Sequence, residues 1–517
     1  MVMDYMIGVD IGTTSTKVAL FDLHGKLQTV SRQLYPLYHE LPDRAEEDPA
    51  AIFAAVIAGL AAVVHDKVVQ QTEVKGIAFS SAMHSVILMD QHDQPLTRAI
   101  TWADNRAVAA AKALKDSANS QQLFARTGVP IHPMSPLTKL MWFKQNQPEL
   151  LRQTKQVIGV KEYVLWRLFG RYVEDYSIAN ATGLFNINTL DWDEAALDLA
   201  GITRAQLPEL VDTDHQLRGM DQEIATTIGL ATDTPVIIGA SDGTLSNLGL
   251  NAIRPGAVAV TIGTSGAVRM VAATPKVDAA GRLFTYYLDK THWVIGGPVN
   301  NGGIVFQWVR DQLFAPEKAI AAAQGTDLYE KLTQLASTIP AGAGGLLCQP
   351  YLGGERAPLW DADARGSYFG LTQSHTRAHL VRATLEGVVY NLNAVLQLLK
   401  ALSDGPLTIQ ASGGFAHSQL WCQILADVFA QNVSIPTSIE SSALGAVVLG
   451  MKSLGYIDDL HDVATMMGTT KQIIPMPADV AVYQRIIPIW SGVTEKLSSE
   501  YEQIAAFQRE FPMMQNN

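Results

Sequence analysis

Two short stretches of this sequence are rich in glycine and in side chains with hydroxyl groups, and these residue types could take part in chemistry. One spans residues 10–17, led by an aspartate, and the other spans residues 261–266, about half the chain further on. Small residues leave backbone N–H groups and hydroxyls accessible, which suits phosphate oxygens. The first stretch lacks the spacing of a P-loop. Either stretch alone could be an ordinary hairpin turn, but two of them, one in each half, favour a phosphate site served by both halves.

Asp242 is the carboxylate whose position suits proton transfer. It follows the apolar run 235–240 and precedes a helix predicted from residue 244. A phosphoryl-transfer enzyme needs a group that accepts the proton of the attacking hydroxyl, and otherwise acts mainly by positioning. An aspartate between a strand and a helix is also a common N-cap. The residues alone leave both interpretations open.

Alternating strands and helices must carry these residues. Apolar, β-branched runs flank both turns, and a helix is predicted over residues 51–69, followed by a strand over 74–80. The second half continues with helices predicted over 376–402 and 418–429. The first half's order of three strands, helix, strand and helix resembles the actin-like, ribonuclease-H-like unit. Such mixtures form layered α/β domains.

Length, charge and cysteine content narrow the class of protein. The chain of 517 residues exceeds what one hydrophobic core supports, so at least two domains are expected. A net charge of −12 argues against nucleic acid as a partner. Only two cysteines occur, which fits a reducing cytosol. The longest uncharged apolar run, 51–64, is short for a membrane span, so a cytoplasmic protein without a membrane partner is expected.

Two longer motifs carry a family resemblance. Residues 134–146, MSPLTKLMWFKQN, resemble the first signature of the FGGY carbohydrate kinases, and residues 366–386 resemble the second. The resemblance covers essentially the whole chain. It implies two actin-like (ribonuclease-H-like) α/β domains with a nucleotide cleft between them. The implied division is an N-terminal FGGY domain, residues 1–253, with the sugar site and first phosphate turn, and a nucleotide-binding C-terminal FGGY domain, residues 254–517.

Within this family the chain resembles the gluconate kinases, at residues 80–86, 100–106, 296–303 and 351–360. That resemblance implies ATP-dependent phosphorylation of D-gluconate at its terminal hydroxyl, giving 6-phospho-D-gluconate. It also implies Mg²⁺ and a homodimer. Xylulose kinases are similar at many of these places, but they typically carry Gly after the Met-His pair, where this chain has Ser85.

The resemblance also implies roles for single residues. Asp242 matches the catalytic base of the family, and Asp10 matches the acidic residue that helps to hold the Mg²⁺-nucleotide. The residues expected at the acceptor site are Met83, His84, Asp104, Arg106, Asp242 and Gly243. The residues expected at the nucleotide site are Gly12, Thr13, Thr14, Ser15, Lys17, Gly263, Thr264, Gly303, Gln307, Gly413, Gly414 and Ser418.

A substrate carboxylate needs a cation or several donors, and a bidentate arginine is the natural choice. Arg106, His84, Lys139 and Arg356 all lie on motif segments. Each also suits a structural ion pair or a buried polar role, so the sequence does not choose among them.

Three other functions stay open at this point. The nearest is the same kinase chemistry on xylulose or another FGGY substrate. The second is a nucleotide-switched interaction protein of the actin kind, which shares paired phosphate turns. The third is a catalytically inactive sugar sensor, against which Asp242 and both turns argue.

Overall fold

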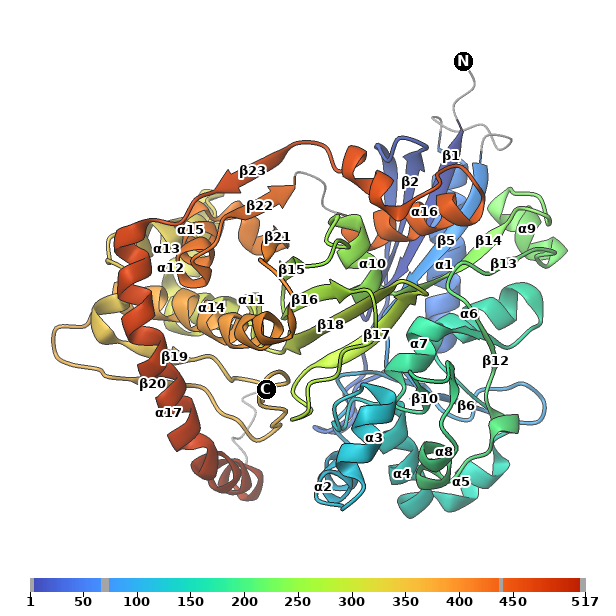
Figure 1. Ribbon diagram of the computed structural model, residues 1–517, viewed down its shortest axis with the longest axis horizontal. Helices are drawn as coiled ribbons and strands as arrows, with labels where there is room; N and C mark the ends of the chain where they lie inside the picture. The colour runs from blue at the N-terminus through green and yellow to red at the C-terminus, as the bar shows by residue number, and fades with distance from the viewer. Residues whose placement is uncertain (1–3, 67–73, 437–439, 512–517) are drawn as a thin grey trace. The chain divides into compact units, whose positions relative to one another are not determined.

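The computed structural model of the chain describes residues 4–66, 74–436 and 440–511, and most of its strands lie in two large sheets (Figure 1). Contacts group the chain into two compact units. The first comprises Met1–Pro255, Val271–Ile295 and Glu440–Gly468, and the second comprises Gly256–Met270, Gly296–Ile439 and Thr469–Asn517. The predicted division of the sequence between residues 253 and 254 stays a prediction.

The first unit contains a six-stranded sheet with the order β13-β14-β5-β1-β2-β3. Its strands are β1 (Tyr5–Ile11), β2 (Ser15–Asp22), β3 (Leu27–Leu34), β5 (Val74–Ser81), β13 (Gln216–Leu217) and β14 (Val236–Ser241). Strands β14, β5 and β1 are parallel to one another, whereas β2 and β3 continue the sheet in antiparallel pairs. The carboxyl ends of β1, β5 and β14 therefore meet at one edge.

Helices, some of which pack against this sheet, and short strand pairs make up the rest of the unit. The helices are α1 (Pro49–Val64), α2 (Val108–Lys115), α3 (Ser120–Thr127), α4 (Pro136–Asn146), α5 (Pro148–Gln153), α6 (Val160–Phe169), α7 (Tyr176–Ala181), α8 (Glu194–Ala200), α9 (Gln222–Ile228), α10 (Asp242–Gly249) and α16 (Ser441–Ser453). The short pairs are β4 (Glu46–Glu47) with β7 (Ala99–Ile100), β6 (Ile87–Met89) with β8 (Gln156–Ile158), β9 (Val173–Asp175) with β12 (Glu209–Val211), and β10 (Phe185–Asn186) with β11 (Asp191–Trp192).

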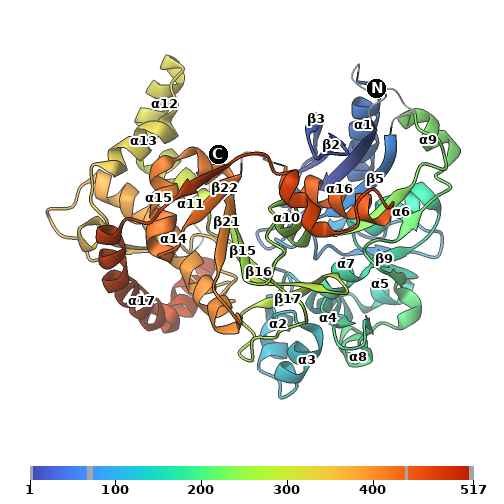
Figure 2. The ribbon, with the colours of Figure 1, turned by 45° about the horizontal axis from the view of Figure 1, so that its top comes forward.

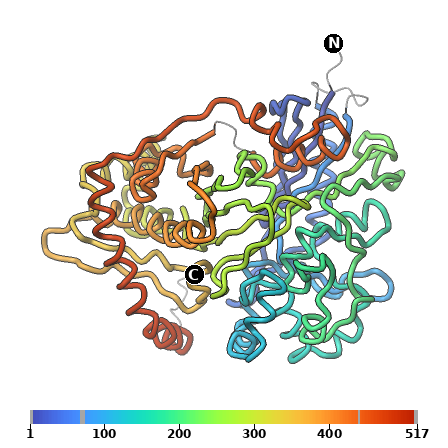
Figure 3. The backbone as a smooth tube through the Cα atoms, in the orientation of Figure 1, coloured from blue at the N-terminus to red at the C-terminus, as the bar shows by residue number. Residues whose placement is uncertain are grey.

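Helix α16 comes from late in the sequence and packs against β1, β5 and α10 (Figure 3). Small residues make this approach possible. A Cβ added at Gly8 of β1 would come within 2.5 Å of the Ala443 carbonyl oxygen, and one added at Gly445 within 2.0 Å of the Leu245 carbonyl oxygen. Glycine at these two positions therefore allows α16 to pack directly on β1 and α10.

The second large sheet has the order β17-β18-β16-β15-β21-β22-β23. Its strands are β15 (Ala257–Ile262), β16 (Gly266–Ala272), β17 (Phe284–Asp289), β18 (His292–Val299), β21 (Thr408–Ser412), β22 (Val433–Pro436) and β23 (Thr470–Ile473). Strands β15, β21 and β22 are parallel. A separate antiparallel pair joins β19 (Leu347–Gln349) and β20 (Ser367–Phe369).

Six α-helices are described in the second unit: α11 (Gly303–Trp308), α12 (Ala315–Gln324), α13 (Leu328–Ser337), α14 (Arg377–Leu402), α15 (Gln419–Phe429) and α17 (Pro477–Glu510). Figure 2 shows α15 beside β22, and α14 packs against α15. Among the described residues, no helix has the length and apolar character required to cross a membrane.

Most predicted elements are confirmed to within a few residues. The helix predicted over 376–402 is Arg377–Leu402, and the strand predicted over 74–80 is Val74–Ser81. The helix predicted over 51–69 begins at Pro49, where the Asp48 side chain caps it, and is described as far as Val64. Residues 67–69 of that prediction lie outside the described residues.

Candidate active site

Three stretches that are far apart in the sequence leave the six-stranded sheet at the same edge. Ile11 lies opposite Ser81 in the parallel β1–β5 pair, and Ser81 lies opposite Ser241 in the β5–β14 pair. Beyond these strand ends come the first phosphate turn, residues 82–84 and Asp242. In α/β sheets, ligands bind at the carboxyl ends of the parallel strands. The structure therefore brings the predicted phosphate turn, acceptor residues and base to one edge of the first unit.

The first phosphate turn is held from outside by two aromatic residues. The Tyr35 hydroxyl donates to the carbonyl oxygen of Gly12, and the Tyr35 backbone N–H donates to that of Thr14 at 3.2 Å. The indole N–H of Trp102 donates to Thr13 Oγ1 at 2.8 Å. The Thr14 side chain itself is exposed. The turn is thus held by hydrogen bonds to two of its carbonyls and one of its side chains. The sequence does not mark Tyr35 as a residue that contacts this turn.

Asp10 lies near the end of β1 and accepts a hydrogen bond from Ser80 Oγ at 2.7 Å. Burial raises the pKa of Asp10, while the Ser80 hydrogen bond and the charge of Lys17 act in the opposite direction. Lys17 Nζ forms an ion pair with Glu440 Oε2 at 2.8 Å. The charge of Lys17, a predicted nucleotide contact, is therefore matched by a carboxylate in this structure.

The residues near Asp10 fit a magnesium ion that arrives with a nucleotide. Mg²⁺ prefers oxygen ligands and typically binds through one or two carboxylates, waters and substrate phosphates. Asp10 supplies such a carboxylate. Within the described ranges, no three or more His, Cys, Asp or Glu side chains are grouped so as to hold a metal. A single carboxylate beside a phosphate turn therefore matches a shared ion better than an all-protein metal cage.

His84 has a strained backbone and a defined ring orientation. Its φ angle is 70°, which is uncommon for a residue other than glycine. Nδ1 lies 2.8 Å from the carbonyl oxygen of Ala181, so Nδ1 carries the proton. Nε2 lies 3.3 Å from the hydroxyl of Tyr286. Tyr286 comes from β17, some 200 residues later in the chain, and no sequence pattern marked it.

Lys139 lies within the first signature, and its ammonium is fully buried. Nζ donates to the backbone carbonyls of His84, Thr101 and Met134 at 2.6, 2.7 and 2.8 Å. Burial lowers the pKa of Lys139 to about 7, whereas these three carbonyl oxygens favour the protonated ammonium. Lys139 thus ties three segments of the predicted acceptor site together. Since its donors are engaged, it is not the cation that meets a substrate carboxylate.

Asp104 and Arg106 form a buried ion pair in the loop after β7. Arg106 Nε and Nη2 donate to the two Asp104 oxygens at 2.7 and 2.8 Å, and Nη2 also contacts Glu46. Asp104 accepts as well from the backbone N–H of Ala45 at 2.9 Å. Two carboxylates therefore share the guanidinium, and the pair folds this loop onto the segment before α1. Whether either residue contacts a substrate stays a prediction.

Asp242 is the first residue of α10 and is half-buried. The N-cap position belongs to Ser241, so N-capping does not explain the aspartate. Asp242 Oδ1 accepts from the backbone N–H of Gly243 at 2.6 Å, and its carbonyl oxygen accepts from Ser442 Oγ at 3.4 Å. The carboxylate thus stands at the sheet edge, directly after the buried strand β14.

The second phosphate turn lies in the second unit and is joined to the start of α11. The backbone N–H of Gly263 donates to Ser265 at 2.9 Å, which closes the turn. Gly303 N–H donates to the carbonyl of Gly263 at 2.7 Å, and Ile304 N–H to that of Thr264 at 3.0 Å. The predicted residues Gly263, Thr264 and Gly303 are therefore neighbours.

Gly413 adds a third segment to this group. Its φ is 110°, and a Cβ there would come within 2.4 Å of the Ile262 carbonyl oxygen, so a side chain is excluded. Strand β21 pairs with β15 such that Ser412 lies opposite Thr261. The next residue, Gly414, has no other atom within 4 Å of an added Cβ, so it borders open space.

The remaining predicted nucleotide residues have less distinctive environments. Ser15 Oγ accepts from Arg32 Nε at 3.2 Å. Gln307 is exposed on α11. Ser418 is the N-cap of α15, where its hydroxyl accepts from Trp421 N–H at 3.1 Å. These contacts neither support nor exclude a role in nucleotide binding.

Glu47, in β4, has a buried carboxyl group near Tyr35, the residue that holds the first phosphate turn. Glu47 is 3% exposed, and no hydrogen-bond partner is found for its Oε1 among the described residues. The Glu47 charge acts on the Tyr35 hydroxyl, so the two groups are near each other. Burial raises the pKa of Glu47 to about 8.

This buried acid predicts a pH-dependent stability. Between about pH 4.3, the ordinary pKa of glutamate, and about 8, the folded state binds more protons at Glu47 than the unfolded state. The free energy of unfolding should therefore fall as pH rises through this window. Glu47→Gln, neutral throughout, should remove that fall, which amounts to at most about 1.4 kcal/mol per pH unit. Urea denaturation at pH 5, 6, 7 and 8 measures it. The exposed Glu495→Gln is the control, and equal pH slopes in wild type and Glu47→Gln would contradict the prediction.

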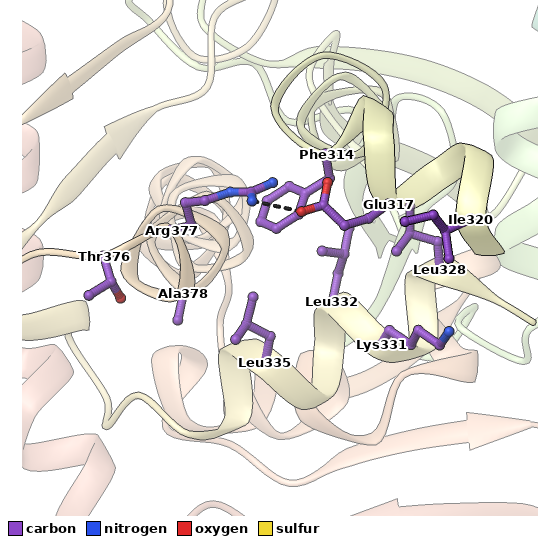
Figure 4. Close-up of a pocket in the computed structure, with 10 residues that line it drawn as sticks. All are labelled: Phe314, Glu317, Ile320, Leu328, Lys331, Leu332, Leu335, Thr376, Arg377 and Ala378. Carbon is purple, nitrogen blue, oxygen red and sulfur yellow. Dashed lines mark hydrogen bonds and ion pairs between the residues drawn. The ribbon is translucent and has the colours of Figure 1, made fainter.

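A groove lies elsewhere, in the second unit (Figure 4). It encloses about 670 Å³ beside α12, α13 and α14. The Arg377 guanidinium lies 3.8 Å from the centre of the Phe314 ring and forms an ion pair with Glu317 at 2.7 Å. Leu332 and Leu335 provide an apolar wall. No residue predicted from the sequence to bind a substrate lines this groove.

Comparison with known proteins shows which family this chain is similar to. Residues 5–249 match the N-terminal domain of the FGGY family of carbohydrate kinases, and residues 258–454 match its C-terminal domain. The chain is 48% identical to the gluconokinase of Bacillus subtilis (strain 168), over 98% of each chain.

Two solved structures share the fold over nearly the whole chain. The gluconate kinase from Lactobacillus acidophilus has a TM-score of 0.91 and 38% identity, covering 97% of this chain and 100% of that one. A ligand-bound xylulose kinase from the same organism has a TM-score of 0.92 with the same identity and coverage. The fold is the mixed α/β, actin-like fold of sugar kinases, and the enzyme is a phosphotransferase that uses ATP. The chain belongs to the FGGY family of carbohydrate kinases.

Proposed function

We propose that this kinase transfers the γ-phosphoryl group of ATP to the terminal hydroxyl of D-gluconate, giving 6-phospho-D-gluconate and ADP. The observation that carries the proposal is the 48% identity to a gluconokinase along 98% of both chains. Similarity to solved structures does not separate the substrates, because the gluconate kinase and the xylulose kinase are each 38% identical to this chain. Phosphorylation of xylulose is the alternative.

In the proposed mechanism Asp242 acts as the base. The substrate hydroxyl oxygen forms a bond to the γ-phosphorus while the bond to the β,γ-bridging oxygen breaks, and the hydroxyl proton passes to the Asp242 carboxylate. Most of the acceleration in such reactions comes from alignment and electrostatic stabilisation rather than covalent catalysis. Mg²⁺ beside Asp10 would neutralise charge on the phosphate oxygens.

The phosphate-site residues of each unit are proposed to serve the nucleotide. In the first unit these are residues 12–15 and Lys17, and in the second unit they are the turn at 263–264, Gly303 and the loop at 413–414. The hydrogen bond from the Gly303 N–H to the Gly263 carbonyl supports the proposal, because it joins predicted residues of two segments. Gln307 and Ser418 are included on resemblance to the family.

The acceptor site is proposed to lie beside the same sheet edge. His84, with its oriented ring, and the half-buried Met83 would contact the substrate near Asp242 and Gly243. Asp104 and Arg106 are proposed to shape this site, as the ion pair that folds the loop. These assignments correspond to an N-terminal domain that binds sugar and a C-terminal domain that binds nucleotide.

A substrate panel tests the choice of acceptor. We expect kcat/KM for D-gluconate to exceed that for D-xylulose by at least about 10²-fold, because a site that pairs with a carboxylate leaves polar groups unpaired when a neutral sugar binds. The measurement is ADP release, with 6-phosphogluconate identified by mass. A higher kcat/KM for xylulose would favour the alternative. ADP release at a rate independent of any sugar would instead favour a nucleotide switch.

We also propose, from family resemblance alone, that the protein is a cytoplasmic homodimer. Sedimentation equilibrium at micromolar protein tests the dimer.

A further inference from the structure

The base of a phosphoryl-transfer enzyme must be held in a fixed place, since a displacement of about 1 Å can cost about 10²-fold in rate. We infer that Ser177, in helix α7, is a positioning residue that fixes the end of β14 and thereby the Asp242 carboxylate. The inference rests on the proposed role of Asp242 as base. Ser177 has no role in the sequence-based assignment, and it lies 65 positions before Asp242.

Three fully buried hydroxyls, one of them on the residue that precedes Asp242, form a cluster. Ser177 Oγ lies 3.1 Å from Ser241 Oγ and 3.2 Å from Thr244 Oγ1, and the latter two lie 3.0 Å apart. The backbone N–H of Ser241 also donates to Ser177 Oγ, at 3.2 Å. Ser177 therefore engages both the N–H and the hydroxyl of Ser241, and this double contact fixes the backbone from which Asp242 extends.

The proton directions in this cluster form one consistent set. Thr244 Oγ1 donates to the backbone carbonyl of Ser241 at 2.9 Å, so its proton is used. The Ser241 hydroxyl then donates to Thr244, and the Ser177 hydroxyl donates to Ser241. Each hydroxyl donates once and accepts once. Such a closed set restricts the rotamers of all three side chains.

Ser177 is itself anchored at the start of α7. Asp175 accepts from the backbone N–H groups of Ser177 and Ile178 at 3.0 and 3.1 Å, and its second oxygen pairs with the buried Lys161. At the other end of the same helix, the Ala181 carbonyl accepts from His84 Nδ1. Helix α7 thus contacts the strand β14, which ends directly before the proposed base, and the residue proposed to meet the acceptor.

These contacts predict an effect on turnover rather than on binding. Ser177→Ala should lower kcat by about 10- to 100-fold while KM for ATP and for gluconate each change by less than about twofold, because the loss is one of alignment. Ser177→Thr, which keeps the hydroxyl, should recover most of kcat. A role in stability alone would lower the unfolding midpoint without this split between kcat and KM.

Ser246→Ala is the matched control. Ser246 lies on the same helix as Asp242, and its hydroxyl pairs with Ser441 Oγ at 3.1 Å, away from Ser241. Its kcat should stay within about twofold of wild type. Should Ser177→Ala not fold, the near-isosteric Thr244→Val removes another hydroxyl of the cluster and carries the same expectation.

Two results would overturn the inference: kcat of Ser177→Ala within about twofold of wild type, or an equal loss in Ser246→Ala. The proposed function fails differently. If Asp242→Asn turned over at the wild-type rate, the base assignment would fall, whatever Ser177→Ala does. If no variant phosphorylated gluconate but all used another sugar, the substrate assignment alone would be wrong.

Discussion

Asp242→Asn is expected to lower kcat by about 10²- to 10⁴-fold, the range typical for loss of a general base. Asparagine has nearly the same shape, yet it cannot accept the hydroxyl proton. Affinity for ATP should stay nearly unchanged, because the proposed nucleotide residues are not altered. The loss should therefore appear in kcat with little change in KM for ATP.

The measurement is ADP release with gluconate as acceptor, beside calorimetric titration of ATP. Asp233→Asn serves as the control. Its carboxylate is 81% exposed in the segment that precedes β14 and contacts Arg218 at 3.6 Å. A kcat for Asp242→Asn within about tenfold of wild type would remove Asp242 from the mechanism.

Lys139→Met is expected to reduce the free energy of unfolding by about 3 kcal/mol or more, because each buried carbonyl left without its hydrogen bond costs about 1–3 kcal/mol. Methionine has a similar length and no donor. Its introduction leaves the carbonyls of His84, Thr101 and Met134 buried without the ammonium that they share. Since these carbonyls belong to three segments of the proposed acceptor site, KM for gluconate should also rise.

Lys144→Met, one turn further along α4, provides the control. Lys144 is exposed, and its ammonium donates to the carbonyl of Asp198 at 2.9 Å on the surface. Urea denaturation of both variants, followed by fluorescence, compares the two losses. Equal destabilisation would show that the buried contacts of Lys139 are worth no more than a surface hydrogen bond.

Local patterns were sufficient for the secondary structure and for the phosphate turns. Apolar, β-branched runs predicted the strands that became β1, β5, β14 and β15, because a strand buried on both faces is recognisable from its own residues. Glycine and hydroxyl residues marked the turns at 12–15 and 263–265, since a tight turn restricts which residues occupy it.

The identity of the family also came from contiguous motifs, and the comparisons confirmed it. The acceptor residues were less accessible to such reasoning. Lys139 was considered as a partner for a substrate carboxylate, but its donors are used by backbone carbonyls up to 55 residues away. A lysine within a motif can bind a substrate or hold the fold together, and its charge alone does not distinguish these two roles.

Some features depend on contacts between segments with no pattern in common. The Tyr286 hydroxyl contacts His84, which lies 202 positions earlier in the sequence. Helix α16 packs on β1 where Gly8 has no side chain, and the sequence does not show that these two segments meet. The sequence by itself determined the elements, the two turns and the family, since these depend on neighbouring residues. Only the tertiary structure decided which side chains share the edge with Asp242, because hydrogen bonds such as that of Ser177 to Ser241 exist only once the chain has folded.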